Sequence, residues 1–112
     1  MAFDENLADR IRKGLGRKKG IEEKKMFGGV GFLLNGNMLV GVWKDSLIAR
    51  LGDEQGEEAL KEAHVKKFDI TGRVMKGWVL VTPEGLKDDD RLKGWIQRAL
   101  KFVEKLPKKE QN

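Results

Sequence analysis

The sequence contains no cysteine and no tyrosine, and its 112 residues include only one serine, one histidine and two prolines. The lack of cysteine excludes disulfides, thiolate nucleophiles, zinc–thiolate sites and iron–sulfur clusters. Nucleophilic catalysis by a serine–histidine pair would have to use Ser46 and His64. The sequence has neither an H-E-x-x-H motif nor an acidic calcium-binding loop. We therefore expect a protein that is not an enzyme and that has no cofactor or bound metal.

Long hydrophobic runs are also missing. The apolar runs of the sequence, such as residues 30–34 and 78–81, are far shorter than the roughly 20 residues that cross a bilayer. The N-terminus lacks a basic leader followed by an apolar stretch. These features predict a cytoplasmic protein without membrane association. The length fits one domain, and 39% hydrophobic residues are enough for a core despite 37% charged residues.

Local patterns predict a two-layer α+β fold. Asp4 as N-cap and the apolar spacing that follows predict a helix over residues 4–15. The turns Asn35-Gly36 and Lys44-Asp45 predict a three-stranded antiparallel meander over residues 26–51. A short helix near residues 53–63, a short strand at 66–70, a strand at 78–82 and an amphipathic helix at 88–106 follow. The predicted order is α-β-β-β-α-β-β-α, with an antiparallel sheet.

The meander predicts two unlike faces, because alternate side chains of a strand point to opposite sides. A two-residue turn pairs Leu34 with Asn37 and Phe32 with Leu39. One face then carries an apolar layer that suits the helices: Gly29, Gly31, Leu33, Met38, Val40, Val42, Leu47, Ala49 and Leu51. The other face is too apolar for ordinary solvent exposure. We interpret it as an interaction face for a protein partner or a second copy, formed by Phe32, Leu39, Trp43, Ile48 and Arg50.

A basic cluster near the N-terminus supports an alternative. Its centre consists of Arg12, Lys13, Arg17, Lys18 and Lys19. Such a cluster attracts phosphates without base specificity, so nucleic acid is a second candidate partner. No RNA-binding signature or recognition-helix pattern accompanies it.

Two glycine-rich segments lead into predicted strands. The first comprises Met26, Phe27, Gly28 and Gly29, and the second comprises Thr71, Gly72, Arg73, Met75, Lys76, Gly77 and Trp78. The glycines favour tight backbone geometry with apolar side chains at the edge of the core. A small-ligand groove at these segments is the other interpretation.

The same segments carry a family resemblance. Residues 23–29 (EKKMFGG), 31–38 (GFLLNGNM), 47–50 (LIAR), 68–73 (FDITGR), 75–79 (MKGWV) and 106–108 (LPK) resemble the N-terminal domain of the TfoX/Sxy competence-regulator family. The resemblance covers nearly the whole chain. It assigns residues 1–108 to one such domain and leaves residues 109–112 as a disordered tail.

The resemblance implies a fold similar in plan to that of type III secretion chaperones. It also implies a bacterial, cytoplasmic, non-enzymatic protein linked to transcriptional control of DNA uptake, acting with the cyclic-AMP receptor protein. Family members carry a second, helical C-terminal domain, and we expect this chain to be the N-terminal domain alone. The family offers no catalytic residues to transfer to this sequence.

Overall fold

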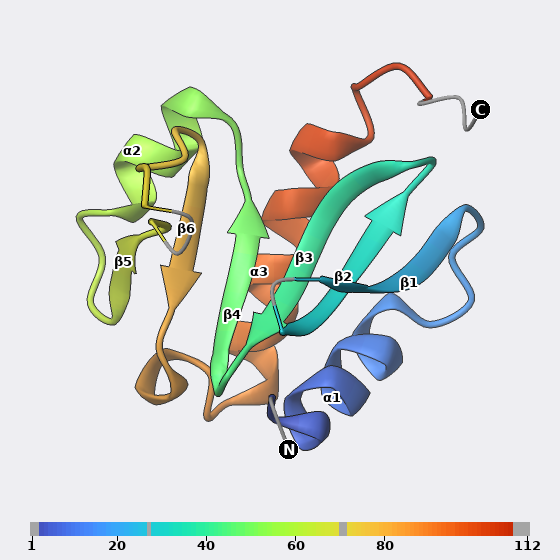
Figure 1. The fold of residues 1–112 in the computed structure, drawn as a ribbon, viewed down its shortest axis with the longest axis horizontal. Helices are drawn as coiled ribbons and strands as arrows, with labels where there is room; N and C mark the ends of the chain where they lie inside the picture. The colour runs from blue at the N-terminus through green and yellow to red at the C-terminus, as the bar shows by residue number, and fades with distance from the viewer. Residues whose placement is uncertain (1–2, 27, 70–71, 109–112) are drawn as a thin grey trace.

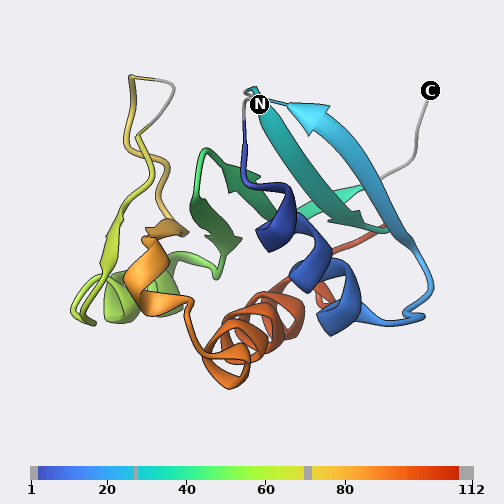
Figure 2. The ribbon, with the colours of Figure 1, turned by 90° about the horizontal axis from the view of Figure 1, so that it is seen from below.

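One antiparallel sheet of six strands organises the computed structural model, which describes residues 3–26, 28–69 and 72–108 (Figure 1). The elements are α1 (Glu5–Leu15), β1 (Ile21–Met26), β2 (Gly29–Leu34), β3 (Asn37–Trp43), β4 (Ser46–Arg50), α2 (Asp53–Ala59), β5 (Val65–Lys67), β6 (Trp78–Val81), the 3-10 turn η1 (Pro83–Gly85) and α3 (Asp89–Val103). The strands lie in the order β1-β2-β3-β4-β6-β5. The helices α1 and α3 pack together on one side of the sheet (Figure 2). The predicted α+β class is confirmed.

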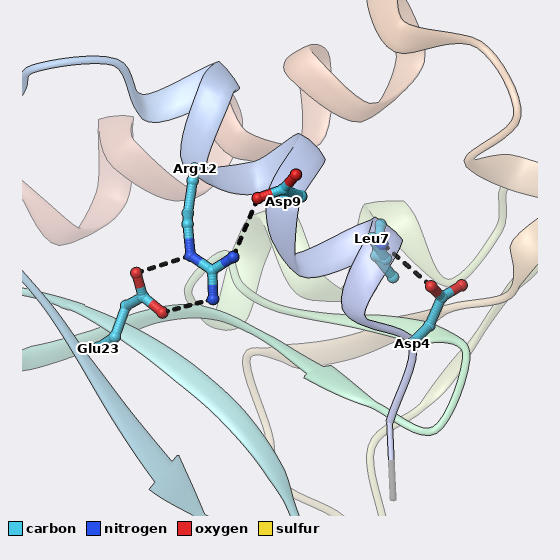
Figure 3. A network of polar contacts seen from close by, with 5 residues as sticks. All are labelled: Asp4, Leu7, Asp9, Arg12 and Glu23. Atoms are coloured by element: carbon cyan, nitrogen blue, oxygen red, sulfur yellow. Dashed lines mark hydrogen bonds and ion pairs between the residues drawn. The ribbon is translucent and has the colours of Figure 1, made fainter. Parts of the chain in front are cut away.

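Capping and apolar spacing explain why α1 and α3 form where the sequence predicts them. The Asp4 carboxylate accepts a hydrogen bond from the backbone N–H of Leu7 at 3.1 Å (Figure 3), and the Asp88 carboxylate accepts one from the backbone N–H of Asp90 at 2.9 Å. Each helix then buries one apolar stripe: Leu7, Ala8, Ile11 and Leu15 in α1, and Leu92, Trp95, Ile96, Ala99, Leu100 and Val103 in α3. The helical layer therefore turns its apolar side to the sheet and its charged side to solvent.

The β1 strand is missing from the predicted order, which has three strands before α2 where the structure has four. Its sequence, IEEKKM, is apolar only at its two ends and shows no alternation. It pairs with β2 as an edge strand and leaves its charged side chains exposed, which discourages further strand pairing. The opposite edge, β5, is limited to Val65–Lys67, whereas residues 66–70 were predicted; residue 70 lies outside the described part of the chain.

The hairpin of β2 and β3 contains a β-bulge that the sequence does not reveal. Leu34 pairs with Asn37 and Leu33 with Met38, as predicted, but Phe32 pairs with Val40. The predicted pairing of Phe32 with Leu39 is therefore wrong, because Leu39 is one extra residue on β3. Leu39 and Val40 both belong to the main core.

The bulge exchanges the two faces of β2 relative to the prediction. Val30 and Phe32 join Val40 and Val42 in the core beneath the helices. By strand alternation Gly29, Gly31, Leu33 and Met38, all predicted to face the helices, lie on the other side of the sheet. A one-residue shift of register has this effect because the side-chain period of a strand is two.

The core has two parts, one on each side of the sheet. The main core lies between the sheet and the helices and includes Phe32, Ile11, Leu47 and Ile96, all almost fully buried. A smaller cluster of Ile48, Phe68 and Leu80 lies on the opposite side. The sheet is therefore apolar on both faces, and only one of them is covered by α1 and α3.

The corrected register makes a testable prediction for Phe32. We expect Phe32→Ala to lower the free energy of unfolding by about 3–5 kcal/mol, because the side chain is fully buried in the main core. Urea denaturation followed by far-ultraviolet circular dichroism measures this change. A loss below about 1 kcal/mol would support the unbulged register, in which Phe32 lies on an open face.

Candidate functional site

The side of the sheet away from α1 and α3 is the candidate site, and we call it the helix-free face. It is formed by five half-buried apolar side chains: Met26, Met38, Trp43, Met75 and Trp78. Trp43, Met75 and Trp78 pack against the smaller core cluster. Figure 2 shows the helices α1 and α3 below the sheet, and the connection from β5 to β6 on the other side of it.

The connection from β5 to β6 covers one half of the helix-free face. Phe68 is buried against Ile48 and Leu80, and its ring centroid lies 5.8 Å from that of Trp78. The backbone N–H of Met75 donates to the carbonyl of Phe68 at 2.9 Å, and that of Trp78 donates to the carbonyl of Met75 at 3.1 Å. These contacts hold the described part of the connection over β4 and β6.

Two glycines and two methionines form the other half of the face. A Cβ placed on Gly31 would lie 2.7 Å from Sδ of Met26 and 3.0 Å from Cε of Met38, and one on Gly41 would lie 2.9 Å from Cε of Met38. The thioether side chains therefore rest directly on the glycine backbone. Methionine is unbranched, flexible and polarizable, so this half of the face can adapt to a partner's shape.

Cations flank the aromatic rings of the face. Nζ of Lys44 lies 4.7 Å from the ring centroid of Trp43. Cζ of Arg50 lies 5.2 Å from the ring of Trp78 and 5.8 Å from that of Phe102. Partial burial lowers the pKa of Arg50 below its usual value, and no carboxylate among the described residues forms an ion pair with it. The face thus presents apolar area with positive charge at its edge.

Only part of the predicted interaction face lies at this site. Phe32 and Leu39 are 0% exposed within the main core, so the prediction that they meet a partner is wrong, and the bulge is the physical reason. Ile48 does lie on the helix-free face, but Phe68 covers it. Trp43 and Arg50 remain half-buried and accessible. Sequence reasoning missed Met38 as a member of the face; the signal available was the pair Gly31 and Gly41, which leaves room for a long side chain.

The two glycine-rich segments have structural roles. A Cβ on Gly29 would collide with the backbone carbonyl oxygen of Val42. Gly77 has φ +88°, and its carbonyl accepts hydrogen bonds from the N–H groups of Leu51 and Gly52 at 2.8 and 3.1 Å. Gly28, Gly72, Arg73 and Lys76 are exposed, while Phe27 and Thr71 lie outside the described residues.

Two of the grooves on the helix side adjoin α3 on the side away from α1. One of about 530 Å³ lies between α2 and α3 and is lined by Asp53, Lys101 and Phe102 among others. Another of about 440 Å³ is lined by residues that include Glu62 and Trp95. Neither is lined by Arg73 or Lys76, the cations considered for a ligand groove.

Ion pairs neutralise two of the five residues of the predicted basic cluster, Arg12 and Lys18. The Arg12 guanidinium donates to both carboxylate oxygens of Glu23, at 2.8 and 2.9 Å, and to Asp9 at 3.1 Å (Figure 3). The hydrogen bonds to Glu23 raise the pKa of Arg12 above its usual value. Nζ of Lys18 lies 2.9 Å from a carboxylate oxygen of Glu104. Of the five predicted residues, Lys13, Arg17 and Lys19 stay exposed without an ion pair in the described part of the chain.

Ser46 and His64, the residues that a serine–histidine pair would have to use, have other hydrogen-bond partners. The Ser46 hydroxyl donates to the Asp45 carboxylate at 3.3 Å. The backbone carbonyl of His64 accepts from the N–H of Thr82 at 2.9 Å, and no hydrogen bond joins Ser46 to His64 within residues 3–26, 28–69 and 72–108. Over the same residues, no three potential ligands from His, Cys, Asp and Glu gather around a point that could hold a metal ion.

The sequence profile of the TfoX N-terminal domain matches residues 13–103, from the last turns of α1 to the end of α3. The chain belongs to this family. The match spans both glycine-rich segments and the whole helix-free face of this TfoX N-terminal domain. Comparison with curated proteins and with solved structures found no match. Among the described residues, no helix has both the length and the apolar character needed to span a membrane.

The glycine contacts predict unequal effects of two alanine substitutions. Gly29→Ala places a methyl group against backbone that cannot move away, and we expect it to lower the free energy of unfolding by about 2–3 kcal/mol. Gly31→Ala displaces only the ends of two methionine side chains, and we expect a cost of about 1 kcal/mol or less. Urea denaturation of both variants measures the difference. Equal costs, or a larger one for Gly31→Ala, would contradict the described placement of Met26 and Met38.

Proposed function

We propose that this TfoX N-terminal domain is a non-enzymatic regulatory module that binds a protein partner through its helix-free face. The observation that carries the proposal is an apolar sheet face over β2 and β3, on the side away from α1 and α3, that the described part of the β5–β6 connection does not cover. Contiguous apolar area of this kind is typical of protein contact sites. Membership of a competence-regulator family supports a role in transcriptional control inside the bacterial cell.

The composition of the face indicates the chemistry of the partner. Met26 and Met38 provide adaptable apolar contact, and Trp43 and Trp78 provide large rigid rings of the kind enriched at interface hot spots. Lys44 and Arg50 stand at the edge of this area. A complementary surface has apolar side chains at its centre and carboxylates at its rim.

Site-specific photo-crosslinking tests the proposal. A benzophenone side chain at position 38 lies on the helix-free face, and one at position 57 lies on the exposed side of α2 as the matched control. We expect a discrete covalent adduct with a protein in cells of the native host from position 38 and none from position 57. Adducts from both positions, or from position 57 alone, would contradict the proposed face.

Sedimentation velocity of the purified chain identifies the partner as a second copy or as another protein. If the partner is a second copy, we expect a dimer that Trp43→Ser weakens by about tenfold or more, because a half-buried tryptophan at an interface contributes about 2 kcal/mol. If the partner is another protein, the chain sediments as a monomer and the position 38 adduct has a mass other than twice that of the chain.

A further inference from the structure

The helices α1 and α3 lie side by side and run in the same direction along the solvent side of the molecule. From the middle of α1, Arg10 bonds to the Asp89 carboxylate at the start of α3 at 2.9 Å and to the carbonyl of Leu86 at 2.6 Å. Near the end of α1, a Cβ on Gly14 would lie 2.9 Å from Cδ1 of Ile96 in the middle of α3. At their ends Lys18 pairs with Glu104. Figure 2 shows the two helices next to each other.

A shallow groove of about 250 Å³ lies between these helices, and its polar lining is Arg10, Lys13, Asp89 and Lys93. The Arg10 guanidinium is neutralised by Asp89. Lys13 and Lys93 come from different helices, both are exposed, and neither has an ion pair among the described residues. The groove therefore carries two uncompensated positive charges.

Further cations continue the same surface. Arg17 and Lys19 follow the end of α1, and both are exposed. The segment around α2 has the opposite sign, because five of its six charged residues are acidic: Asp53, Glu54, Glu57, Glu58 and Glu62, with Lys61 as the exception. The region of α2 is thus acidic, whereas Lys13, Arg17, Lys19 and Lys93 give the α1–α3 surface exposed cations without an ion pair among the described residues.

We propose that the α1–α3 surface binds the phosphate backbone of duplex DNA. Lysine and arginine side chains that neutralise phosphates release condensed counterions, which gives binding without base specificity. Lys13 lies on α1, Lys93 lies on α3, and Arg17 and Lys19 follow the end of α1, so these cations are spread over two helices and do not surround a single anion. This second surface lies on the opposite side of the sheet from the helix-free face and is independent of the function proposed for that face.

Two other anionic partners fit the surface less well. A membrane-binding helix inserts an exposed apolar stripe into the bilayer, but the apolar stripes of α1 and α3 are buried against the sheet. An acidic protein partner needs an apolar anchor at the centre of its interface, and the groove lining exposes mainly charged side chains.

Fluorescence anisotropy with a labelled DNA duplex tests the proposal. The salt concentration is varied between about 50 and 200 mM, because the affinity of phosphate contacts falls steeply over this range. With Lys13, Arg17, Lys19 and Lys93 in contact, we expect the logarithm of the association constant to fall with that of the salt concentration at a slope of about −3 to −4. The double variant Lys13→Gln/Lys93→Gln should reduce this slope to about −2 and weaken binding about tenfold or more at the lowest salt.

The matched control is Lys66→Gln/Lys67→Gln, which removes the same charge from β5 at the far edge of the sheet. We expect this variant to bind DNA like the unmodified chain. Equal weakening by both pairs would overturn the proposal, since net charge alone would then account for binding. No binding at 50 mM salt, or binding to phosphatidylglycerol vesicles without binding to DNA, would also overturn it. Circular dichroism of each variant verifies that the fold is retained.

Discussion

The extra residue at Leu39 determines which side of β2 meets the helices. Without it, Gly29 and Gly31 would share a face with Val40 and Val42, and the main core would lack the large side chains of Val30 and Phe32. With it, Leu39 and Val40 both turn toward α3, and the glycines pass to the other side. The bulge therefore places large side chains of β2 in the main core and, at the same time, leaves only glycines at positions 29 and 31 on the opposite face.

The glycines on the helix-free face explain why methionine side chains form much of its surface. Small residues at Gly31 and Gly41 leave space that Met26 and Met38 occupy from neighbouring strands, so the surface is apolar but not rigidly packed. The half of the sheet over β4 and β6 is closed instead by Phe68 and Trp78. One sheet thus combines a fixed apolar half, which stabilises the β5–β6 connection, with an adaptable half that is available to a partner. The match to the TfoX N-terminal domain spans the glycines that create this difference.

Local signals predict the elements of this fold better than their pairing. The cap at Asp4, the Asn35-Gly36 turn and the apolar stripe of α3 each act within a few residues, and each is found where expected. The bulge acts between strands, and because Leu39 and Val40 are both apolar, neither register leaves a charge in the core to exclude it. The sequence therefore places Trp43 and Arg50 correctly on the candidate site. It places Phe32 and Leu39 there wrongly, because the bulge turns both side chains into the main core. β1 escaped prediction because its four central side chains are charged and exposed, and only the residues at its two ends, Ile21 and Met26, are half-buried.

The charged surfaces, like the strand pairing, depend on contacts between residues far apart in the sequence. The distribution of charge in space therefore differs from its distribution along the chain. The N-terminal cluster loses Arg12 to Glu23 and Lys18 to Glu104, a residue 86 positions away. Lys13 gains Lys93 as a neighbour across the α1–α3 groove, which no linear pattern indicates. Because α1 and α3 must bury their apolar stripes on one face of the sheet, their charged sides combine into one surface behind that face. The packing that leaves one side of the sheet free of helices therefore also brings Lys13 and Lys93 together on the other.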